Sequence, residues 1–299
     1  MYHRPVSSPG GDPLVTVVIP TFDRLPLLRE ALASVAAQSY PHWEVVIVDD
    51  GSSDDTVAAI RALADPRVRV LERPHRGHIG SVRNAGVATA RGELIAFLDA
   101  DDLWHAAKLE RQVAAMRRSG AAWSYTVFEM MDARQQPIPM QAGVCRPLSG
   151  WIVRDMIEDR TGVMISTVVV TRALFDAVGG FSENPRLTHR GDFELALRLA
   201  VTAEVCAVPD TLTRVREHQG RTTATLSRPF ERTALVFDGF LALTLPADVR
   251  RSARRGRARQ LVHAAAQRKR GGEYGPAARL LIRAAVDRAL AAWPMTSRR

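Results

Sequence analysis

The stretch LIAFLDADD, residues 94–102, joins five apolar residues to a segment that contains three aspartates. A short, unbroken apolar run predicts a strand that is buried on both faces, as the strands of a parallel sheet are. Carboxylates that directly follow such a strand lie at its carboxyl end, where open α/β sheets bind their ligands. We therefore expect a buried strand over Leu94–Leu98 and a functional loop over Asp99–Asp102.

Three earlier segments rich in β-branched apolar residues, with Thr16 inside the first and Arg69 inside the third, predict strands over Val15–Ile19, Val45–Val48 and Val68–Leu71. Apolar spacing or capping residues predict helices between the strands. The expected helices cover Leu27–Gln38, the segment from the capping run at 52–56 to about Ala64, and Ser81–Ala90. This alternation indicates an α/β fold with a Rossmann-like, mostly parallel sheet covered by helices on both faces.

Two of the earlier strands also end in polar clusters. These clusters are PTFDR at residues 20–24 and DDGS at residues 49–52. The carboxyl ends of parallel strands meet at one edge of the sheet. We therefore expect both clusters to share one site with the acidic loop at 99–102.

The second half of the chain is less regular. Its patterns predict a strand over Ile165–Val170, a turn at Gly179-Gly180 and a helix over Asp192–Ala203. The C-terminal segment is rich in Ala and Arg, with two helical stretches at Val249–Arg268 and Pro276–Ala292. These stretches predict a C-terminal helical hairpin.

The formal net charge is +9, and nearly all the positive charge comes from arginine. It is concentrated between Arg250 and Arg299, without the interleaved aromatic residues of a single-strand nucleic-acid platform. We therefore expect no nucleic-acid partner. No apolar run reaches the roughly 20 residues of a membrane span, and the first dozen residues lack a secretory signal. These features predict a cytoplasmic protein, in which Cys145 and Cys206 receive no role.

The acidic loop offers ligands for a hard cation. In an extended segment Asp99 and Asp101 point to the same side, because one residue separates them. Carboxylate oxygens are the ligands that Mg²⁺ and Mn²⁺ prefer. The alternative is a turn followed by a cap for a helix over Lys108–Arg118.

Five motifs carry a resemblance to a known family. The motifs are VVIPTFDR at 17–24, VIVDDGSSDDT at 46–56, RNAG at 83–86, RGE at 91–93 and FLDADD at 97–102. With these motifs in this order and spacing, the chain resembles family 2 glycosyltransferases with the GT-A fold, strongly over residues 15–115 and more weakly to about residue 220.

The resemblance implies a domain organisation. Residues 14–245 would form the GT-A domain, with a nucleotide-binding half at 14–115 and an acceptor half at 116–245. Residues 1–13, rich in Pro, Gly and Ser, would be a disordered lead-in. Residues 246–299 would form a helical extension.

By the same resemblance, the chain binds a nucleotide-sugar donor. Asp50 would accept a hydrogen bond from the imide N–H of a uracil-like or thymine-like base. Its neighbour Asp49 would point the other way, where capping the next turn is the alternative role. Arg83 would meet the donor phosphate or sugar, and a structural clamp is the alternative. The donor contacts implied are Pro20, Thr21, Phe22, Arg24, Asp50, Arg83 and Asp99.

The resemblance also identifies a DXD motif, in which Asp101 is the direct metal ligand, Asp99 lies nearer the ribose or donor sugar, and Asp102 orients the loop. His218, in an Arg-X-His segment, would approach the metal or the diphosphate, with a structural histidine as the alternative. Asp192 would be the general base that deprotonates the acceptor hydroxyl in a single inverting displacement. The alternative is that Asp192 only starts a helix.

These features predict an inverting, metal-dependent glycosyltransferase that uses a UDP- or dTDP-sugar and Mg²⁺ or Mn²⁺. The acceptor would be a carbohydrate, lipid-linked or small molecule, in polysaccharide, cell-envelope or natural-product glycoside synthesis. The rival is a non-catalytic nucleotide-sugar-binding relative. A nucleotidyltransferase or dinucleotide-dependent oxidoreductase is disfavoured, because residues 20–24 lack the glycines of a phosphate loop.

The helical extension leaves several roles open. Its alanine and leucine residues suit packing against the domain or against another subunit. Peripheral contact with the anionic inner face of a membrane is the alternative, because the same helices are basic.

Overall fold

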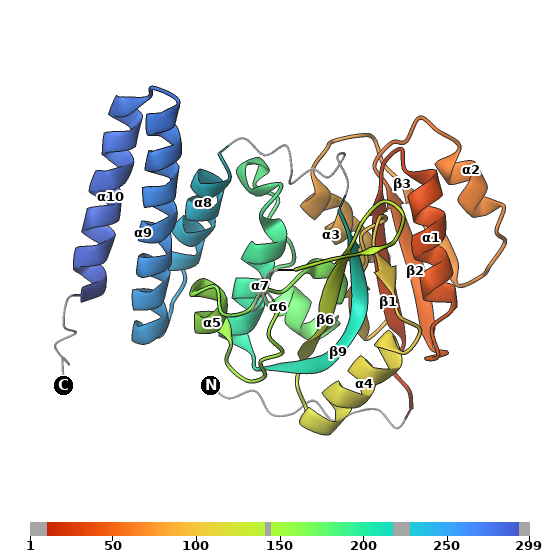
Figure 1. Ribbon diagram of the computed structural model, residues 1–299. Coiled ribbons are helices and arrows are strands. Elements are labelled where there is room, and N and C mark those ends of the chain that lie inside the picture. Colours follow the sequence, from red (N-terminus) through yellow and green to blue (C-terminus); the bar gives the residue numbers. More distant parts are fainter. Residues whose placement is uncertain (1–10, 141–144, 218–227, 293–299) are drawn as a thin grey trace.

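The computed structural model of the chain describes residues 11–140, 145–217 and 228–292. Figure 1 shows a twisted central sheet covered by helices, with a group of long helices at one side. The sheet has nine strands in the order β3-β2-β1-β4-β8-β6-β9-β5, and β7 pairs with β6 outside this path.

The first four strands run parallel, as the sequence predicts. β1 pairs with β2 on one side and β4 on the other, and β2 pairs with β3. Every residue of β1 and β2 is buried, which explains their apolar runs. The elements of this half are β1 Val15–Thr21, α1 Leu25–Ala36, β2 Trp43–Asp49, α2 Thr56–Arg61, β3 Val68–Glu72, α3 Ile79–Thr89 and β4 Leu94–Phe97.

Beyond β4 the sheet is mixed. β8 runs antiparallel to β4 and β6, while β6 and β9 run parallel and β5 pairs antiparallel with β9. The expected strand over Ile165–Val170 is instead a 3-10 turn followed by β8, and the turn directs the Ser166 hydroxyl to the acidic loop. The elements here are β5 Leu103–Trp104, α4 Lys108–Ser119, β6 Trp123–Met131, β7 Pro137–Ile138, α5 Val153–Ile157, η1 Ile165–Thr167, β8 Val169–Thr171, α6 Arg172–Ala177, η2 Pro185–Leu187, α7 Gly191–Thr202 and β9 Val205–Arg216.

Two apolar clusters cover opposite faces of the sheet. One joins Val17 of β1 to α1 and α4, and the other joins Val18 to α3 and α7. At Gly86, α3 lies so close to the sheet that a Cβ atom there would approach Val18 Cγ1 at 2.5 Å and Val48 Cγ2 at 2.9 Å. This close packing fixes the helix that carries Arg83.

The expected C-terminal hairpin is present, and a further helix that the sequence patterns did not predict precedes it. This helix, α8, places Val236 and Phe237 in the core of the acceptor half and Ala234 against Leu261 of α9. The hairpin is therefore braced on the domain through α8. The three helices are α8 Pro229–Leu241, α9 Ala247–Arg270 and α10 Tyr274–Ala292. Within the described ranges, no helix is both long and apolar enough to cross a membrane.

Candidate active site

Three aspartates of the acidic loop converge at the carboxyl end of β4. One carboxylate oxygen each from Asp99, Asp101 and Asp102 lie within 4.8 Å of one another. Oxygen atoms grouped in this way form a donor set that a hard divalent cation such as Mg²⁺ or Mn²⁺ accepts. The residues present therefore fit a divalent metal ion.

Asp102 is the buried member of the group and anchors the loop. Its Oδ2 accepts a hydrogen bond from the Ser166 hydroxyl at 2.6 Å, and its Oδ1 accepts one from the backbone N–H of Arg216 at 3.0 Å. Burial and the nearby Asp101 and Asp99 carboxylates raise the pKa of Asp102 well above its usual range. These contacts agree with an orienting role for Asp102.

Arg216 holds the acidic loop from the opposite side. Its side chain is only 3% exposed, its Nε donates to the Asp101 carbonyl oxygen at 2.9 Å, and it forms an ion pair with Glu30 of α1. The loop is thereby tied to both β9 and α1. His218, predicted to approach the metal, lies outside the described residues.

Arg83 connects the acidic loop to the segment that holds the predicted base. Its guanidinium donates to Asp99 Oδ1 at 2.6 Å and to Asp192 Oδ1 at 2.5 Å. The Arg83 side chain is 2% exposed, whereas those of Asp99 and Asp192 are 29% and 39% exposed. Both acids therefore keep oxygen atoms open to solvent, and residues 83, 99 and 192 meet although they are far apart in the sequence.

The electrostatics of this junction are coupled. Although burial opposes its charge, the Asp192 and Asp99 carboxylates raise the pKa of Arg83 above its ordinary value. Burial raises the pKa of Asp99, Arg83 lowers it, and Asp192 and Asp101 raise it again, with a net upward shift. The Asp192 carboxylate binds Arg83, so it does more than start α7.

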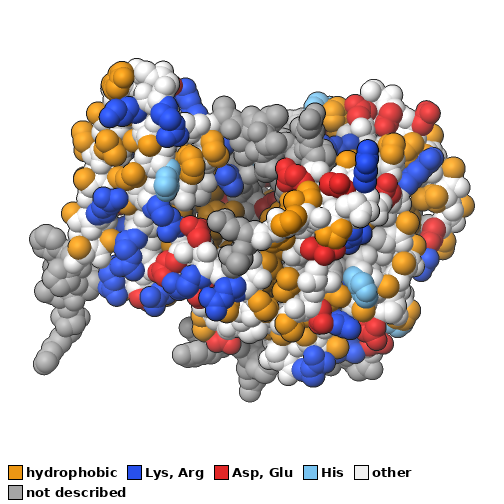
Figure 2. Space-filling view, viewed as in Figure 1, with side chains coloured by type: hydrophobic (Ala, Val, Ile, Leu, Met, Phe, Trp, Pro, Cys, Tyr) orange, Lys and Arg blue, Asp and Glu red, His pale blue; other side chains and the backbone are white. Residues whose placement is uncertain are grey.

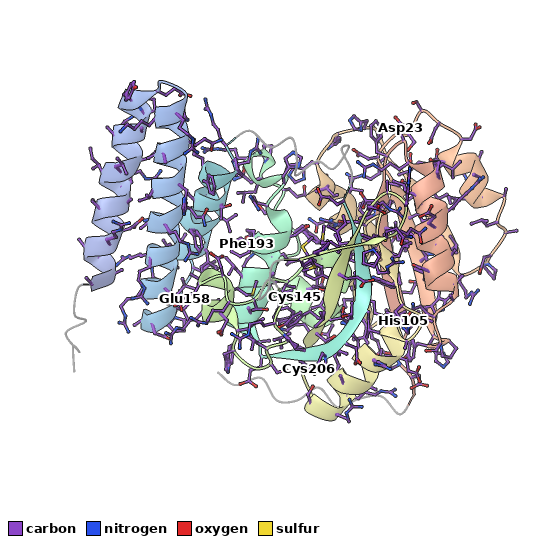
Figure 3. All side chains as sticks on the ribbon, in the orientation of Figure 1. Asp23, His105, Cys145, Glu158, Phe193 and Cys206 are labelled. Atoms are coloured by element: carbon purple, nitrogen blue, oxygen red, sulfur yellow. The ribbon has the colours of Figure 1, made fainter. Side chains whose placement is uncertain are left out.

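The loops after β1 and β2 are locked together. Asp23 accepts hydrogen bonds from the backbone N–H groups of Ser53 at 2.7 Å and Asp54 at 3.3 Å, and its own N–H donates to Ser52 Oγ at 2.9 Å. Figure 3 labels Asp23 beyond the end of β1. Arg24, the next residue, donates to Asp101 Oδ2 at 2.8 Å. The predicted donor loop and the acidic loop therefore share one site.

Asp50 faces a loop that the sequence did not single out. Its carboxylate accepts hydrogen bonds from the backbone N–H groups of Arg76 at 3.3 Å and Gly77 at 2.9 Å. Asp49 points the other way and accepts from the N–H of Ser52 at 2.9 Å. The two neighbours thus divide as expected, with Asp49 closing its own turn and Asp50 directed toward residues 75–77.

Phe22 and His75 form an aromatic wall beside Asp50. Their rings stack with centroids 4.1 Å apart and planes 24° apart, and His75 Nδ1 lies 3.1 Å from Asp50 Oδ2. Phe22 is 39% exposed, so its ring is available to a flat ligand. His75 was missed because a lone histidine outside any motif carries no signal.

Pro20 and Thr21 lie beneath this wall in buried β1. The Thr21 hydroxyl is buried without a hydrogen-bond partner in the described part of the chain. The other predicted donor contacts lie in two places. Phe22 and Asp50 lie against His75. Arg24 and Arg83 bind Asp101 and Asp99 of the acidic loop.

The chain was compared with known proteins. Residues 16–161 match the family model described as glycosyl transferase family 2. The chain is 32% identical over 121 residues to the Escherichia coli UDP-Glc:alpha-D-GlcNAc-diphosphoundecaprenol beta-1,3-glucosyltransferase WfgD, covering 40% of this chain and 48% of that protein. It is 34% identical over 128 residues to the Bacillus subtilis putative teichuronic acid biosynthesis glycosyltransferase TuaG, covering 42% and 51%. The chain spans about half the length of these two relatives.

Solved structures share the fold. Staphylococcus aureus TarS 1-349 in complex with UDP-GlcNAc aligns with a TM-score of 0.66 and 16% identity, over 90% of each chain. The mannosyltransferase PcManGT from Pyrobaculum calidifontis, in complex with GDP-Man and Mn²⁺, aligns with a TM-score of 0.58 and 20% identity, over 95% of this chain and 89% of that one. The fold is therefore GT-A, and by the family model and the curated relatives residues 16–161 of the chain belong to glycosyl transferase family 2.

Proposed function

We propose that the chain is an inverting glycosyltransferase that moves a sugar from a UDP- or dTDP-sugar to an acceptor hydroxyl. One observation carries the proposal: Arg83 joins Asp99 of the acidic loop to Asp192 of α7. A donor-side carboxylate and a second, half-exposed carboxylate thus flank one space at the end of the sheet. This is the arrangement that a direct displacement requires.

The base of the donor would lie at the Phe22–His75 wall. Phe22 offers a ring face, and Asp50 offers a carboxylate acceptor for an imide N–H. An exposed aromatic ring stacks on any nucleobase, so Phe22 would give no preference among bases. Asp50 would supply the preference for uracil or thymine. TarS has been solved with UDP-GlcNAc, which supports a uridine nucleotide donor.

A divalent ion would be held by Asp101 and Asp99, with Asp102 behind them. When bound, Mg²⁺ or Mn²⁺ stabilises the negative charge that develops on a departing diphosphate. PcManGT has been solved with Mn²⁺, which supports this metal class. Arg24 holds Asp101 and Arg83 holds Asp99, so both carboxylates are oriented by ion pairs.

Asp192 would act as the general base. Its carboxylate takes the proton of the acceptor hydroxyl as the acceptor oxygen attacks the anomeric carbon. The bond from that carbon to the diphosphate breaks on the opposite face, and the nucleoside diphosphate leaves with the bonding electrons. One displacement of this kind inverts the anomeric configuration.

Calorimetry of UDP binding with and without Mn²⁺ tests the metal site. Asp101→Asn keeps the side-chain size and removes the ligand charge, so Mn²⁺-dependent UDP affinity should fall about tenfold or more. Asp65→Asn, on an exposed ion pair, is the matched control and should bind like the wild type. The metal assignment would be refuted if wild-type UDP affinity were the same with and without Mn²⁺, or if Asp101→Asn left the Mn²⁺-dependent affinity unchanged.

The acceptor would belong to cell-envelope polysaccharide synthesis, as the names of WfgD and TuaG suggest for those relatives. The rival remains a non-catalytic nucleotide-sugar-binding relative. A screen of nucleotide-sugar hydrolysis and transfer separates the two. UDP binding without hydrolysis or transfer for any donor would favour the rival.

We place the enzyme at the inner face of a membrane, through α10. The side of α10 turned away from α9 carries apolar residues that are 41–65% exposed. They are Leu281, Ile282, Val286 and Leu290. Figure 2 shows Lys and Arg side chains spread over the visible face of these helices. Residues 247–292 hold twelve Arg or Lys and three Asp or Glu.

Charge favours a lipid surface over a second copy of the chain. The one acid of α10, Asp287, is buried, while Arg279, Arg283 and Arg288 are exposed on the same helix. A two-fold dimer through this face would set arginine near arginine, because such an interface is self-complementary. Anionic headgroups would instead neutralise these arginines while the apolar side chains enter the interface.

Vesicle co-sedimentation tests this location. Ile282→Ser with Val286→Ser should weaken binding to vesicles of phosphatidylglycerol and phosphatidylcholine about tenfold or more, because two exposed apolar side chains are lost. Leu63→Ser, at an exposed position in the donor half, is the control. Equal binding of all three proteins, or none by the wild type, would contradict the proposed contact.

A further inference from the structure

A second polar cluster, made of His78, His189, Arg190 and Arg232, lies on the Asp192 side of Arg83. Arg190 is two residues before Asp192, and Arg232 comes from α8, which packs on α7 and η2. Burial lowers the pKa of His189, and the charges of Arg232, Arg190 and His78 lower it further. The four side chains are therefore electrostatic neighbours, although they come from three separate parts of the chain.

His78 is folded toward the same region. It caps α3 by accepting the N–H of Ser81 at 3.1 Å. A Cβ atom at Gly80 would meet His78 Cε1 at 3.1 Å, Phe181 Cβ at 3.3 Å and the Ser182 carbonyl at 2.8 Å. The His78 ring thus lies against the loop that also carries Phe181, whose ring centroid is 5.1 Å from the Arg83 guanidinium carbon.

The four members of this cluster form no ion pair with a carboxylate in the three ranges that the structure describes. Arg190 Nε and His78 Nε2 are buried without a hydrogen-bond partner. Burial and the charge of Arg232 lower the pKa of Arg190. Holding such donors together unpaired is unfavourable, so the arrangement is suited to a bound anion.

The contrast with Arg83 indicates what the cluster is for. Arg83 forms ion pairs with Asp99 and Asp192, so its charge is balanced even though its Nε is buried without a hydrogen-bond partner. Arg190 of the cluster stands directly before α7, two residues from Asp192, whose carboxylate would receive the acceptor proton. Arginine presents planar, forked donors that match a phosphate group.

We propose that this cluster binds an anionic group of the acceptor, a phosphate or diphosphate, and so holds the acceptor hydroxyl at Asp192. The inference rests on the proposed transferase function and adds the acceptor's chemical class. The anion could also come from the donor's own diphosphate. The experiment separates these two sources.

Calorimetry with inorganic pyrophosphate tests the proposal. The protein is first saturated with UDP and Mg²⁺, so that the donor site is filled, and pyrophosphate is then titrated. Wild type should bind it, and Arg190→Gln and Arg232→Gln should each weaken this binding about tenfold or more. UDP affinity should stay within about twofold of wild type in both variants. Arg288→Gln, at an exposed position on α10, is the control.

The outcomes are distinct. Absent pyrophosphate binding, or binding that both variants leave unchanged, overturns the inference, while UDP binding in the same experiment leaves the proposed donor site intact. A parallel loss of UDP affinity in the variants assigns the cluster to the donor and also overturns it. Failure of wild type to bind UDP would count against the proposed function itself. Arg190→Lys, which keeps the charge, should recover part of the affinity and exclude a folding defect.

Discussion

Two arginines in different regions each bind two aspartates from different elements. In one case the arginine is the most buried member of the group, and in the other case one of the aspartates is. In the catalytic half, Arg83 is 2% exposed and its partners Asp99 and Asp192 are 29% and 39% exposed. In the helical extension, Arg257 is 21% exposed, while Asp287 of α10 is 1% exposed and Asp238 of α8 is 31% exposed. Where the arginine is buried and the aspartates are partly exposed, as at Arg83, carboxylate oxygens remain accessible to a ligand. A buried aspartate such as Asp287 offers none, so its ion pair only holds the helices together.

The largest effect should follow from Arg83→Met. Without the guanidinium, Asp99 and Asp192 lose their common anchor and repel each other across the site. We expect kcat/KM for transfer to fall about a thousandfold, the scale of losing a preorganised charged group. Steady-state kinetics with the best donor measure this loss.

Arg91→Met is the matched control, because Arg91 is 61% exposed and pairs with Glu44 away from the site. It should change kcat/KM by less than twofold. Turnover of Arg83→Met within about threefold of wild type would show that the Arg83 junction is structural, like the one at Arg257.

The second effect should appear in the bundle. Asp287→Asn removes a sealed carboxylate that accepts from Arg257 at 2.5 Å and 2.7 Å. We expect a loss of about 3 kcal/mol in the local stability of the hairpin, because one partner of a buried pair stays charged. Hydrogen exchange of α9 and α10 measures it, and UDP binding should be unchanged.

Asp238→Asn is the comparison within the same junction. Asp238 is 31% exposed, so its loss should cost about 1 kcal/mol or less. If both variants loosened the hairpin equally, burial of the acid would not be what distinguishes the two aspartates.

The donor half could be predicted from the sequence because its strands are buried on both faces. Val15–Ile19 is therefore apolar except for Thr16 and Val45–Val48 is apolar throughout, and the acids after the strands mark one edge of the sheet. The meeting of Asp99 with Asp101 follows from this order. The meeting of either with Asp192 does not, since it depends on Arg83 and the packing of α7.

Other parts of the site depend on tertiary closure alone. Residues 75–77 reach Asp50 because the chain turns sharply at Gly51. A Cβ atom at this position would lie only 2.8 Å from the backbone nitrogen of His75. Ser166 lies in a 3-10 turn where a strand is expected, and its hydroxyl donates a hydrogen bond to Asp102. Helix α8 contains no recognisable motif. Its apolar residues pack against α7 and α9, so its position depends on the tertiary structure.

The smallest effect concerns Lys108, a buried amine that forms no ion pair in the described part of the chain. Lys108 is fully buried, donates to Gln112 Oε1 at 2.6 Å, and lies with its Nζ 4.1 Å from the Trp104 ring centroid. Burial lowers the pKa of Lys108 well below its usual range. The folded state therefore holds the amine neutral at pH values where the unfolded chain binds a proton.

Because the unfolded state binds the extra proton, this group makes stability rise with pH, from the lowered folded pKa up to the ordinary lysine value of about 10.4. Lys108→Met removes this term. The stability of the variant relative to wild type should be greater at pH 7 than at pH 10. Urea unfolding at several pH values measures the difference. Lys269→Met, at the one other lysine and exposed, should follow the wild-type curve. A Lys108→Met curve parallel to wild type would mean that the buried amine keeps its proton, held by the Trp104 ring face.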